Sequence, residues 1–384
     1  MYERQNTNLQ GRRRVVLGLT GLMGVLVTGC SLNDSAHSPA SPSQSATQRR
    51  VTATPTSKVA QGTTLYVYTE HNAPVQDLAW SPDSISIVSA ARPGAAQSPI
   101  RVWNALTGAA SSIDQTSIGL TQAPLAWSPD GKNIATCSLA IDAVGSQQVF
   151  IWDAQTGSSV STTRSQNDFI AQVIWSSDNS HIAVAGSYGV EIVNPTFGKV
   201  MLTYPVPLTS ETKQPSMVAA WSPDGHTIAS AAAKTGHSLQ FWNAKTGQPL
   251  HYFLGSSPTV TVWAPDGHTL ATGSATYSQS PQVLNVQSGR AILTAQTQLP
   301  IPPDAGQTGE GRALPHTISW SPDSTLIAVA NNQNQVQIWN IATKSLAYTY
   351  REHTAPVMAI AWSPNGSYIA SASYDKTVRV WQAV

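Results

Sequence analysis

Apolar and polar residues alternate in short runs along most of this chain. The run at 357–362 reads Val-Met-Ala-Ile-Ala-Trp, so a strand with its two-residue period would carry apolar side chains on both faces. A Ser-Pro-Asn-Gly turn follows at 363–366, where Pro presets a negative φ and Gly accepts a positive one. The same pattern predicts a second strand at 368–373 and a third at 377–381.

A second kind of turn follows the third strand of each unit. It reads Trp-Asn-Ala-Leu-Thr-Gly from Trp103, Trp-Asp-Ala-Gln-Thr-Gly from Trp152 and Trp-Asn-Ala-Lys-Thr-Gly from Trp242. An Asn or Asp side chain can accept bonds from backbone amides ahead of it, and the Gly supplies the reversal. The chain then enters a further strand, such as 346–350. Each unit is therefore predicted to hold four antiparallel strands.

These units repeat along the chain, each marked by the tripeptide Trp-Ser-Pro or a close variant. Successive copies are 47, 48, 46, 42, 57 and 42 residues apart. A period of roughly 40–45 residues is typical of stacked four-stranded blades that cannot bury their apolar faces alone. The alternative is an unclosed sandwich of short strands. Seven copies with the same internal spacing of strands and turns favour an array of repeated blades instead. The seven copies begin at Trp80, Trp127, Trp175, Trp221, Trp263, Trp320 and Trp362.

The repeats resemble the WD-repeat (Trp-Asp repeat) β-propeller family over residues 63–384. The resemblance rests on the Trp-Ser-Pro-Asp-Gly turns and on third strands that end in Trp followed by Asn or Asp. It implies an all-β fold, a seven-bladed β-propeller of four-stranded antiparallel blades. Since 347–357 and 65–75 match almost position for position, we expect the segment 64–68 to pair with the strand ending at Trp381 and to close the ring.

The resemblance also implies a structural hydrogen-bond set in the last blade. In the family, a His before the first strand, a Ser or Thr on the second, an Asp in the next turn and the third-strand Trp are linked. Ser, His and Asp might suggest a catalytic triad, but slots that recur in every repeat favour a structural role. The residues that match the pattern are His353, Ser371, Asp375 and Trp381. Blade one keeps His71 and Trp103 without the Asp, and blades three and five have Val193 and Leu284 in place of the Trp.

The first 30 residues are predicted to be a signal peptide. Three arginines at 12–14 precede an apolar run at 15–27, and Cys30 follows in a sequence that resembles the bacterial lipobox, which implies lipidation of Cys30. An ordinary signal peptide, an uncleaved anchor and a twin-arginine export signal are alternatives. Residues 31–62 are rich in Ser, Thr, Pro and Gln and should form a disordered tether. We therefore expect an exported chain, anchored to the outer face of a bacterial cytoplasmic membrane or cell envelope.

Charge and motif spacing exclude several classes of function. The chain holds 21 Lys and Arg against 20 Asp and Glu, and without a basic stripe we expect no nucleic-acid partner. The histidines lack ligand spacing, and no phosphate loop or nucleophile elbow occurs, so we predict no metal, no cofactor and no catalytic residue. Cys137 lies in a second-strand sequence and should be a small buried hydrophobe. The recurring turn aspartates suit backbone bonding rather than a carboxylate site.

The variable connections indicate where binding would occur. Turns between first and second strands and between third and fourth strands are short and alike, whereas connections on the opposite face differ, the longest being 296–316. The family resemblance implies partner contacts just before the turn to the third strand. We therefore predict a monomeric protein-binding scaffold, not an enzyme. The alternatives are a propeller binding a small ligand or glycan at the channel mouth and a hydrolase built there. The candidate partner-binding residues are Arg92, Leu139, Tyr374 and Arg312.

Overall fold

A computed structural model gives the architecture, and every element in the part it describes is a β-strand. None of the described residues form a helix long and apolar enough to cross a membrane. The predicted lipidation site Cys30 and the predicted partner-binding residues Leu139 and Arg312 lie outside the described residues. The described residues are 59–92, 100–111, 121–138, 146–205, 217–232, 239–253, 258–273, 280–296 and 317–384.

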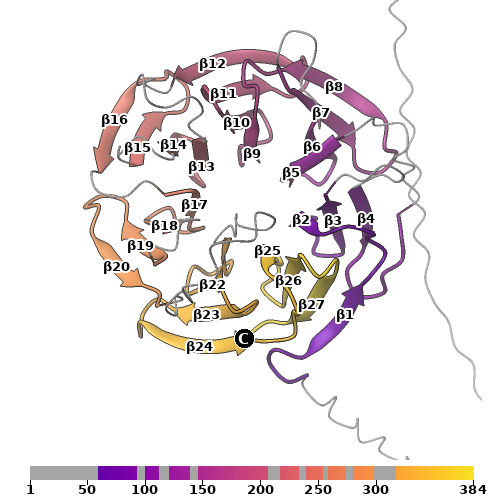
Figure 1. Ribbon diagram of the computed structural model, residues 1–384. Helices are drawn as coiled ribbons and strands as arrows, with labels where there is room; N and C mark the ends of the chain where they lie inside the picture. Colours follow the sequence, from indigo (N-terminus) through magenta and orange to yellow (C-terminus); the bar gives the residue numbers. More distant parts are fainter. Residues whose placement is uncertain are drawn as a thin grey trace, which may run out of the picture. The chain divides into compact units, whose positions relative to one another are not determined.

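Seven sheets stand around a common centre, and each is one blade (Figure 1). The first strand of each blade lies innermost and the last described strand lies toward the perimeter. The predicted all-β, seven-bladed propeller is confirmed.

In blades two to six, four strands follow in chain order; blade one has three described strands, and the outer strand of blade seven is β1. Blades one to three contain β2 (Val75–Trp80), β3 (Ser86–Ala91) and β4 (Ile100–Asn104); β5 (Thr121–Trp127), β6 (Asn133–Ser138), β7 (Gln148–Asp153) and β8 (Ser159–Arg164); and β9 (Ile170–Trp175), β10 (Ile182–Gly186), β11 (Gly189–Asn194) and β12 (Lys199–Pro205). Blades four and five contain β13 (Met217–Trp221), β14 (Thr227–Ala232), β15 (Leu239–Asn243) and β16 (Pro249–Phe253); and β17 (Val260–Trp263), β18 (Thr269–Gly273), β19 (Gln282–Asn285) and β20 (Ala291–Thr294). Blades six and seven contain β21 (Ile318–Trp320), β22 (Leu326–Ala330), β23 (Val336–Asn340) and β24 (Ser345–Tyr350); and β25 (Val357–Trp362), β26 (Tyr368–Ser373), β27 (Val378–Gln382) and the N-terminal β1 (Thr64–Tyr68).

The ring is closed by β1, which pairs antiparallel with β27. Thr64 lies opposite Trp381 and Tyr68 opposite Val378, and just before β1 the Gly62 amide donates to the Gln382 carbonyl at 2.9 Å. The pairing predicted from the duplicated sequence is therefore confirmed. It covers the outer edge of β27, which would otherwise present unpaired amides and carbonyls.

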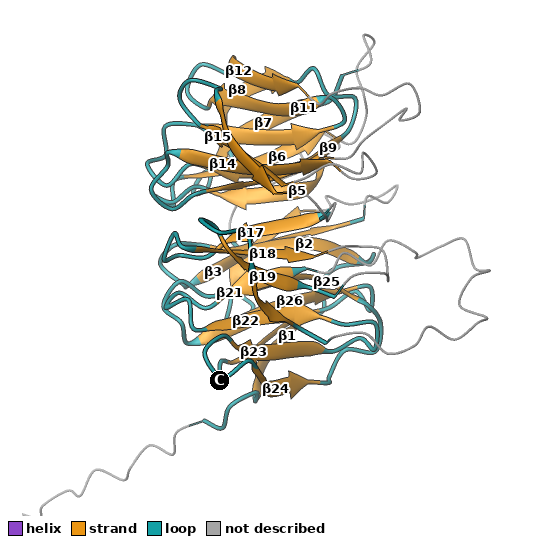
Figure 2. Cartoon of the chain, turned by 90° about the vertical axis from the view of Figure 1, so that its left-hand side faces the viewer, coloured by secondary structure: helices purple, strands orange, loops and turns teal. Residues whose placement is uncertain are grey.

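The turn between first and second strands has the same hydrogen bonds in most blades. In blade six the Ser321 hydroxyl donates to Asp323, and the Thr325 amide donates back to the same carboxylate oxygen at 3.1 Å. The turn aspartates therefore serve the backbone, as the sequence suggests. In Figure 2 these turns and those between third and fourth strands lie along the left-hand side of the ring. We call this side the turn face and the opposite side the variable face.

The core lies within and between the blades. The second strands carry many small side chains that are buried. In blade seven, for example, Ala370 and Ala372 have no exposed surface. Aromatic rings join adjacent blades, because a Tyr on the outer strand of one blade packs on the third-strand Trp of the next, stacked in two pairs and tilted in the third. The pairs, with their ring-centroid separations, are Tyr68–Trp103 at 4.2 Å, Tyr350–Trp381 at 4.4 Å and Tyr204–Trp242 at 5.3 Å. Cys137 is buried, as predicted.

Candidate interaction face

Two of the predicted partner-binding residues lie in equivalent backbone positions on the variable face. Arg92 follows β3 and is exposed, and its amide donates to the Pro74 carbonyl at 2.7 Å. Tyr374 follows β26 and is partly buried, and its amide donates to the Pro356 carbonyl at 2.9 Å. Each residue is therefore held by the connection that enters its own blade. The side chains are presented from fixed positions at the rim rather than from the middle of a long loop.

The hydrogen-bond set of blade seven includes Asp375, the residue that follows Tyr374 in the turn between β26 and β27. The His353 imidazole contacts Asp375 through Nδ1 and Ser371 through Nε2, each at 2.8 Å, and Trp381 Nε1 donates to the Ser371 hydroxyl at 3.3 Å. The structure thus brings all four residues into one chain of contacts. All are buried or nearly so, and the serine contacts both the imidazole and the indole. These contacts join three parts of the blade: the connection that enters its first strand, its second strand and its third strand.

The charge state of this set follows from its contacts. Burial alone would raise the pKa of Asp375, but hydrogen bonds from His353 and Thr377 outweigh it and hold the pKa well below its usual range. The carboxylate is therefore ionised at neutral pH. Because its hydrogen-bond partners lie in the same blade and its side chain is only 7% exposed, the geometry assigns it to holding the turn that carries Tyr374.

Blade one contains a shorter form of the same arrangement. His71 Nε2 contacts the Ser89 hydroxyl at 2.7 Å, and Trp103 Nε1 donates to that hydroxyl at 3.0 Å. Burial, with help from the nearby Arg101 guanidinium, lowers the pKa of His71 to about 4. The imidazole is therefore neutral at neutral pH, so it needs no carboxylate partner.

Blade three has replaced the set by a different polar cluster. Val184 stands at the register position of Ser371, opposite Glu191. The buried Glu191 accepts hydrogen bonds from the Ser165 hydroxyl at 2.7 Å and from the Gln166 amide at 2.8 Å. Burial raises the pKa of Glu191 despite these bonds. The carboxyl group therefore fastens the connection between β8 and β9 to the third strand.

Blade three presents two exposed aromatic side chains that are not among the predicted site residues, one on this connection and one in the turn between β10 and β11. Phe169 is 48% exposed and Tyr188 is 43% exposed. Their segments are joined, because the Ser187 amide donates to the Phe169 carbonyl and the Tyr188 hydroxyl donates to Asp168, both at 3.0 Å. The available signal was a Ser-Tyr-Gly turn in place of the usual small or polar residues. Aromatic and Arg side chains dominate interface energies, so Phe169 and Tyr188 extend the candidate face.

Asp77, on the first strand of blade one, has a carboxyl group with a raised pKa. Both oxygens of Asp77 accept backbone amides, from Leu78 and from Leu125 of the next blade, at 2.9 Å each. Burial raises the pKa of Asp77 to about 6, although the two amide bonds lower it. Because both oxygens are engaged by the backbone, the geometry assigns Asp77 to joining blades one and two.

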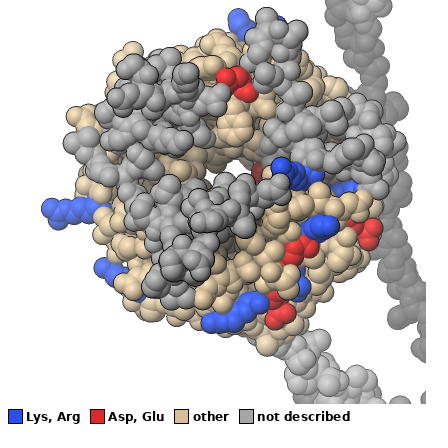
Figure 3. Space-filling model, in the orientation of Figure 1, with Lys and Arg blue, Asp and Glu red and all other residues tan. Residues whose placement is uncertain are grey.

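Charge on the variable face is mixed and sparse. In Figure 3 acidic and basic side chains are interspersed around the ring, and the described surface shows no continuous stripe of either sign. Within the described ranges, no group of three or more His, Cys, Asp or Glu residues could hold a metal ion. The described chemistry of this face is therefore that of aromatic, Arg and small polar groups.

Comparison with known families supports a WD-repeat β-propeller. The family "WD domain, G-beta repeat" matches residues 62–95 and 344–382, which hold β1 to β3 and β24 to β27. The family "Eukaryotic translation initiation factor eIF2A" matches residues 140–296, from the connection before β7 to the end of β20. A comparison with curated proteins found no match. The match at 344–382 contains His353, Ser371 and Trp381, and the match at 62–95 contains His71 and Ser89.

Proposed function

We propose that this chain is a membrane-tethered, extracytoplasmic scaffold that binds a protein partner through its variable face. The observation that carries the proposal is the contrast between the two faces. On the turn face most blades repeat one hydrogen-bonded turn, whereas on the variable face blades one, three and seven present Arg92, the Phe169 and Tyr188 pair, and Tyr374. Exposed aromatic and Arg groups on a rigid frame are suited to bind a protein surface.

Partner capture from native membranes tests the binding face. The substitutions Phe169→Ser and Tyr188→Ser together should reduce recovery of the partner at least about tenfold, because aromatic anchors often contribute 2 kcal/mol or more to binding. Phe197→Ser is the matched control. Phe197 is 80% exposed in the same blade but lies in the turn between its third and fourth strands, on the turn face. Equal loss of the partner with this control would contradict binding through the variable face.

The tether has its own test at Cys30. The basic residues at 12–14, the apolar run at 15–27 and the lipobox-like sequence support an exported, lipid-anchored chain. Cys30→Ser should abolish incorporation of labelled fatty acid and move the chain from the membrane fraction to the aqueous fraction. Cys137→Ala, at a buried position in the ring, should change neither. Retention of Cys30→Ser in membranes with unchanged labelling would reject lipidation at Cys30.

A further inference from the structure

The seams between adjacent blades are joined by two kinds of hydrogen bond. In three seams the first-strand Trp of one blade donates its indole N–H to a carbonyl of the preceding blade, and a turn side chain accepts the amide of the preceding turn. With the donor named first, the two bonds are Trp80 to Ala361 and Asn365 to Ser84 between blades seven and one, Trp175 to Ala126 and Asp130 to Asn179 between blades two and three, and Trp320 to Val262 and Asp266 to Ser324 between blades five and six. All six are 2.9–3.3 Å long. In three further seams a first-strand side chain accepts an amide of the next blade. These acceptors are Asp77, Gln172 and Ser319.

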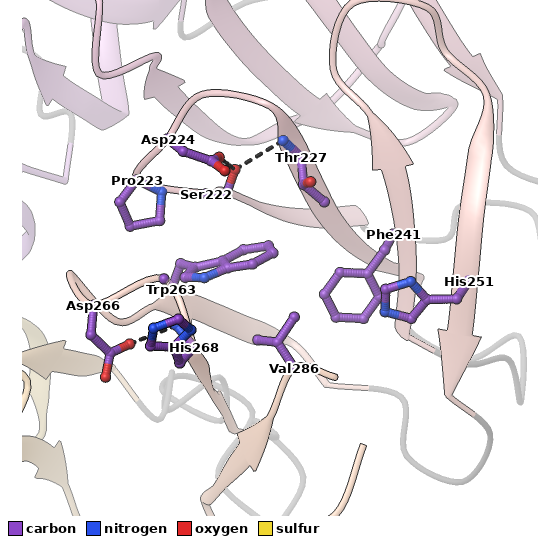
Figure 4. Close-up of a pocket in the computed structure, with 11 residues that line it drawn as sticks. Ser222, Pro223, Asp224, Thr227, Phe241, His251, Trp263, Asp266, His268 and Val286 are labelled. Atoms are coloured by element: carbon purple, nitrogen blue, oxygen red, sulfur yellow. Dashed lines mark hydrogen bonds between the residues drawn. The ribbon is translucent and has the colours of Figure 1, made fainter. Parts of the chain in front are cut away.

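The seam between blades four and five has neither kind of bond among its described residues and contains a cavity of about 360 Å³ (Figure 4). The glycines in the turns between first and second strands show that the turns of blades four and five lie farther apart than those of the other adjacent blades compared. A Cβ added at Gly131, Gly225 or Gly366 would meet the preceding turn at 3.6–3.9 Å, whereas at Gly267 it would meet nothing within 4 Å. Among these four described turn glycines, the gap therefore occurs only at Gly267.

Aromatic side chains form the inner wall of the cavity. Trp263 is 9% exposed and packs edge-to-face on the fully buried Phe241, with ring centroids 5.7 Å apart. The exposed His251 stacks on the other side of Phe241 at 4.4 Å. Leu284, in the same apolar cluster, stands where five other blades have a Trp. Since leucine is smaller than an indole, the third strand of blade five fills less of this seam.

Two aspartates border the cavity from equivalent turns of the two blades. Asp224 and Asp266 each use Oδ1 to accept the amide two residues ahead, from His226 at 2.9 Å and His268 at 2.7 Å. Desolvation raises the pKa of Asp224, but hydrogen bonds from Ser222 and His226 outweigh it, so the pKa is lowered and the carboxylate is ionised. No Lys or Arg is among the described residues that line the cavity. The site is therefore acidic at its rim and aromatic inside.

We infer that this cavity binds the guanidinium group of an arginine side chain from a protein partner. The inference rests on the proposed scaffold function, since the arginine is taken to belong to the partner. A guanidinium is planar, stays charged, stacks on aromatic faces and donates in two directions within its plane. It can therefore lie against Trp263 while donating to the two carboxylates. A lysine ammonium offers a point charge without the plane and suits the slot less well.

Nuclear magnetic resonance of the full chain tests this site with Nα-acetyl-arginine amide as the probe. The indole N–H signal of Trp263, assigned from the spectrum of Trp263→Phe, should shift saturably with the arginine compound. Nα-acetyl-citrulline amide, which has nearly the same shape and no charge, should leave it unmoved. Asp224→Asn with Asp266→Asn should weaken binding about tenfold or more, the expected loss for two partly exposed ion pairs.

Matched substitutions at equivalent turns separate the cavity from a general charge effect. Asp130→Asn with Asp323→Asn changes the same turn position in blades two and six and should leave arginine binding intact. The single variant Asp224→Asn provides a milder change whose fold is checked by the remaining indole signals. Equal shifts with citrulline, equal weakening by the control pair or an unmoved Trp263 signal would overturn the inference. If a partner is still captured after such a result, the proposed scaffold function is supported and only arginine binding at the cavity is rejected. If arginine binds but no partner is captured, only the scaffold function is rejected.

Discussion

A chain that begins at Glu70, and so lacks β1, is expected to lose cooperative unfolding. Removal of β1 uncovers the edge of β27 and takes away Tyr68, which is 2% exposed and stacks on Trp103. Truncation of a buried aromatic side chain alone costs about 3–5 kcal/mol. That is a large share of the roughly 5–15 kcal/mol that stabilises a typical protein, and the lost strand pairing adds to it. Thermal unfolding followed by circular dichroism measures the effect.

The reference for this truncation is a chain that begins at Ser57 and keeps β1. It should melt cooperatively, and Tyr68→Phe in it should keep the ring stacking and differ by less than about 1 kcal/mol. Tyr68→Ala should fall between the reference and the truncated chain. A truncated chain with the melting temperature of the reference would show that β1 does not stabilise the ring.

The substitution Asp375→Ala is expected to destabilise the propeller by about 1.5–3 kcal/mol, the usual contribution of a buried hydrogen bond to a charged group. It leaves His353 Nδ1 without its acceptor in a side chain that is 0% exposed. Because the pKa of Asp375 is depressed in the folded state, its stabilisation is present above the ordinary carboxyl pKa of about 3.9. It is lost as the pH falls below that value. Denaturant unfolding at neutral and acidic pH measures both effects.

Asp153→Ala provides the control for this substitution. Asp153 also accepts turn amides, from Gln155 and Thr156, but in an exposed turn, so its loss should cost about 1 kcal/mol. The difference between wild type and Asp375→Ala should shrink at acidic pH. A difference that is small at neutral pH, or that grows as the pH falls, would contradict the assignment of Asp375 as an ionised, buried acceptor.

Local pattern sufficed for the blades and for the closure of the ring. The second strand at 368–373 is placed as predicted, the third begins one residue later, at Val378, and the outer strand of blade six begins one residue earlier, at Ser345. These elements could be predicted because alternation and turn residues act within a few positions. Closure could be predicted because 65–75 duplicates 347–357.

The remaining features depend on contacts that no local pattern records. Glu191 fastens the connection through Ser165 because Val184 and Val193 replaced the polar members of blade three. The cavity between blades four and five depends on the distance between two turns. In the structure this distance shows at Gly267, where an added Cβ would meet no atom within 4 Å. The absence of a third-strand Trp at Leu284 is evident from the sequence, but the cavity is not.

The affinity of the captured partner for paired variants of blade three tests the central proposal most directly. The account predicts that Phe169→Ser with Tyr188→Ser raises the Kd at least about tenfold, while Phe197→Ser on the turn face leaves the Kd unchanged. Melting temperatures equal to wild type would show that both variants retain the ring. An unchanged Kd for the Phe169 and Tyr188 variant, with a raised Kd for Phe197→Ser, would place binding on the turn face and contradict the account.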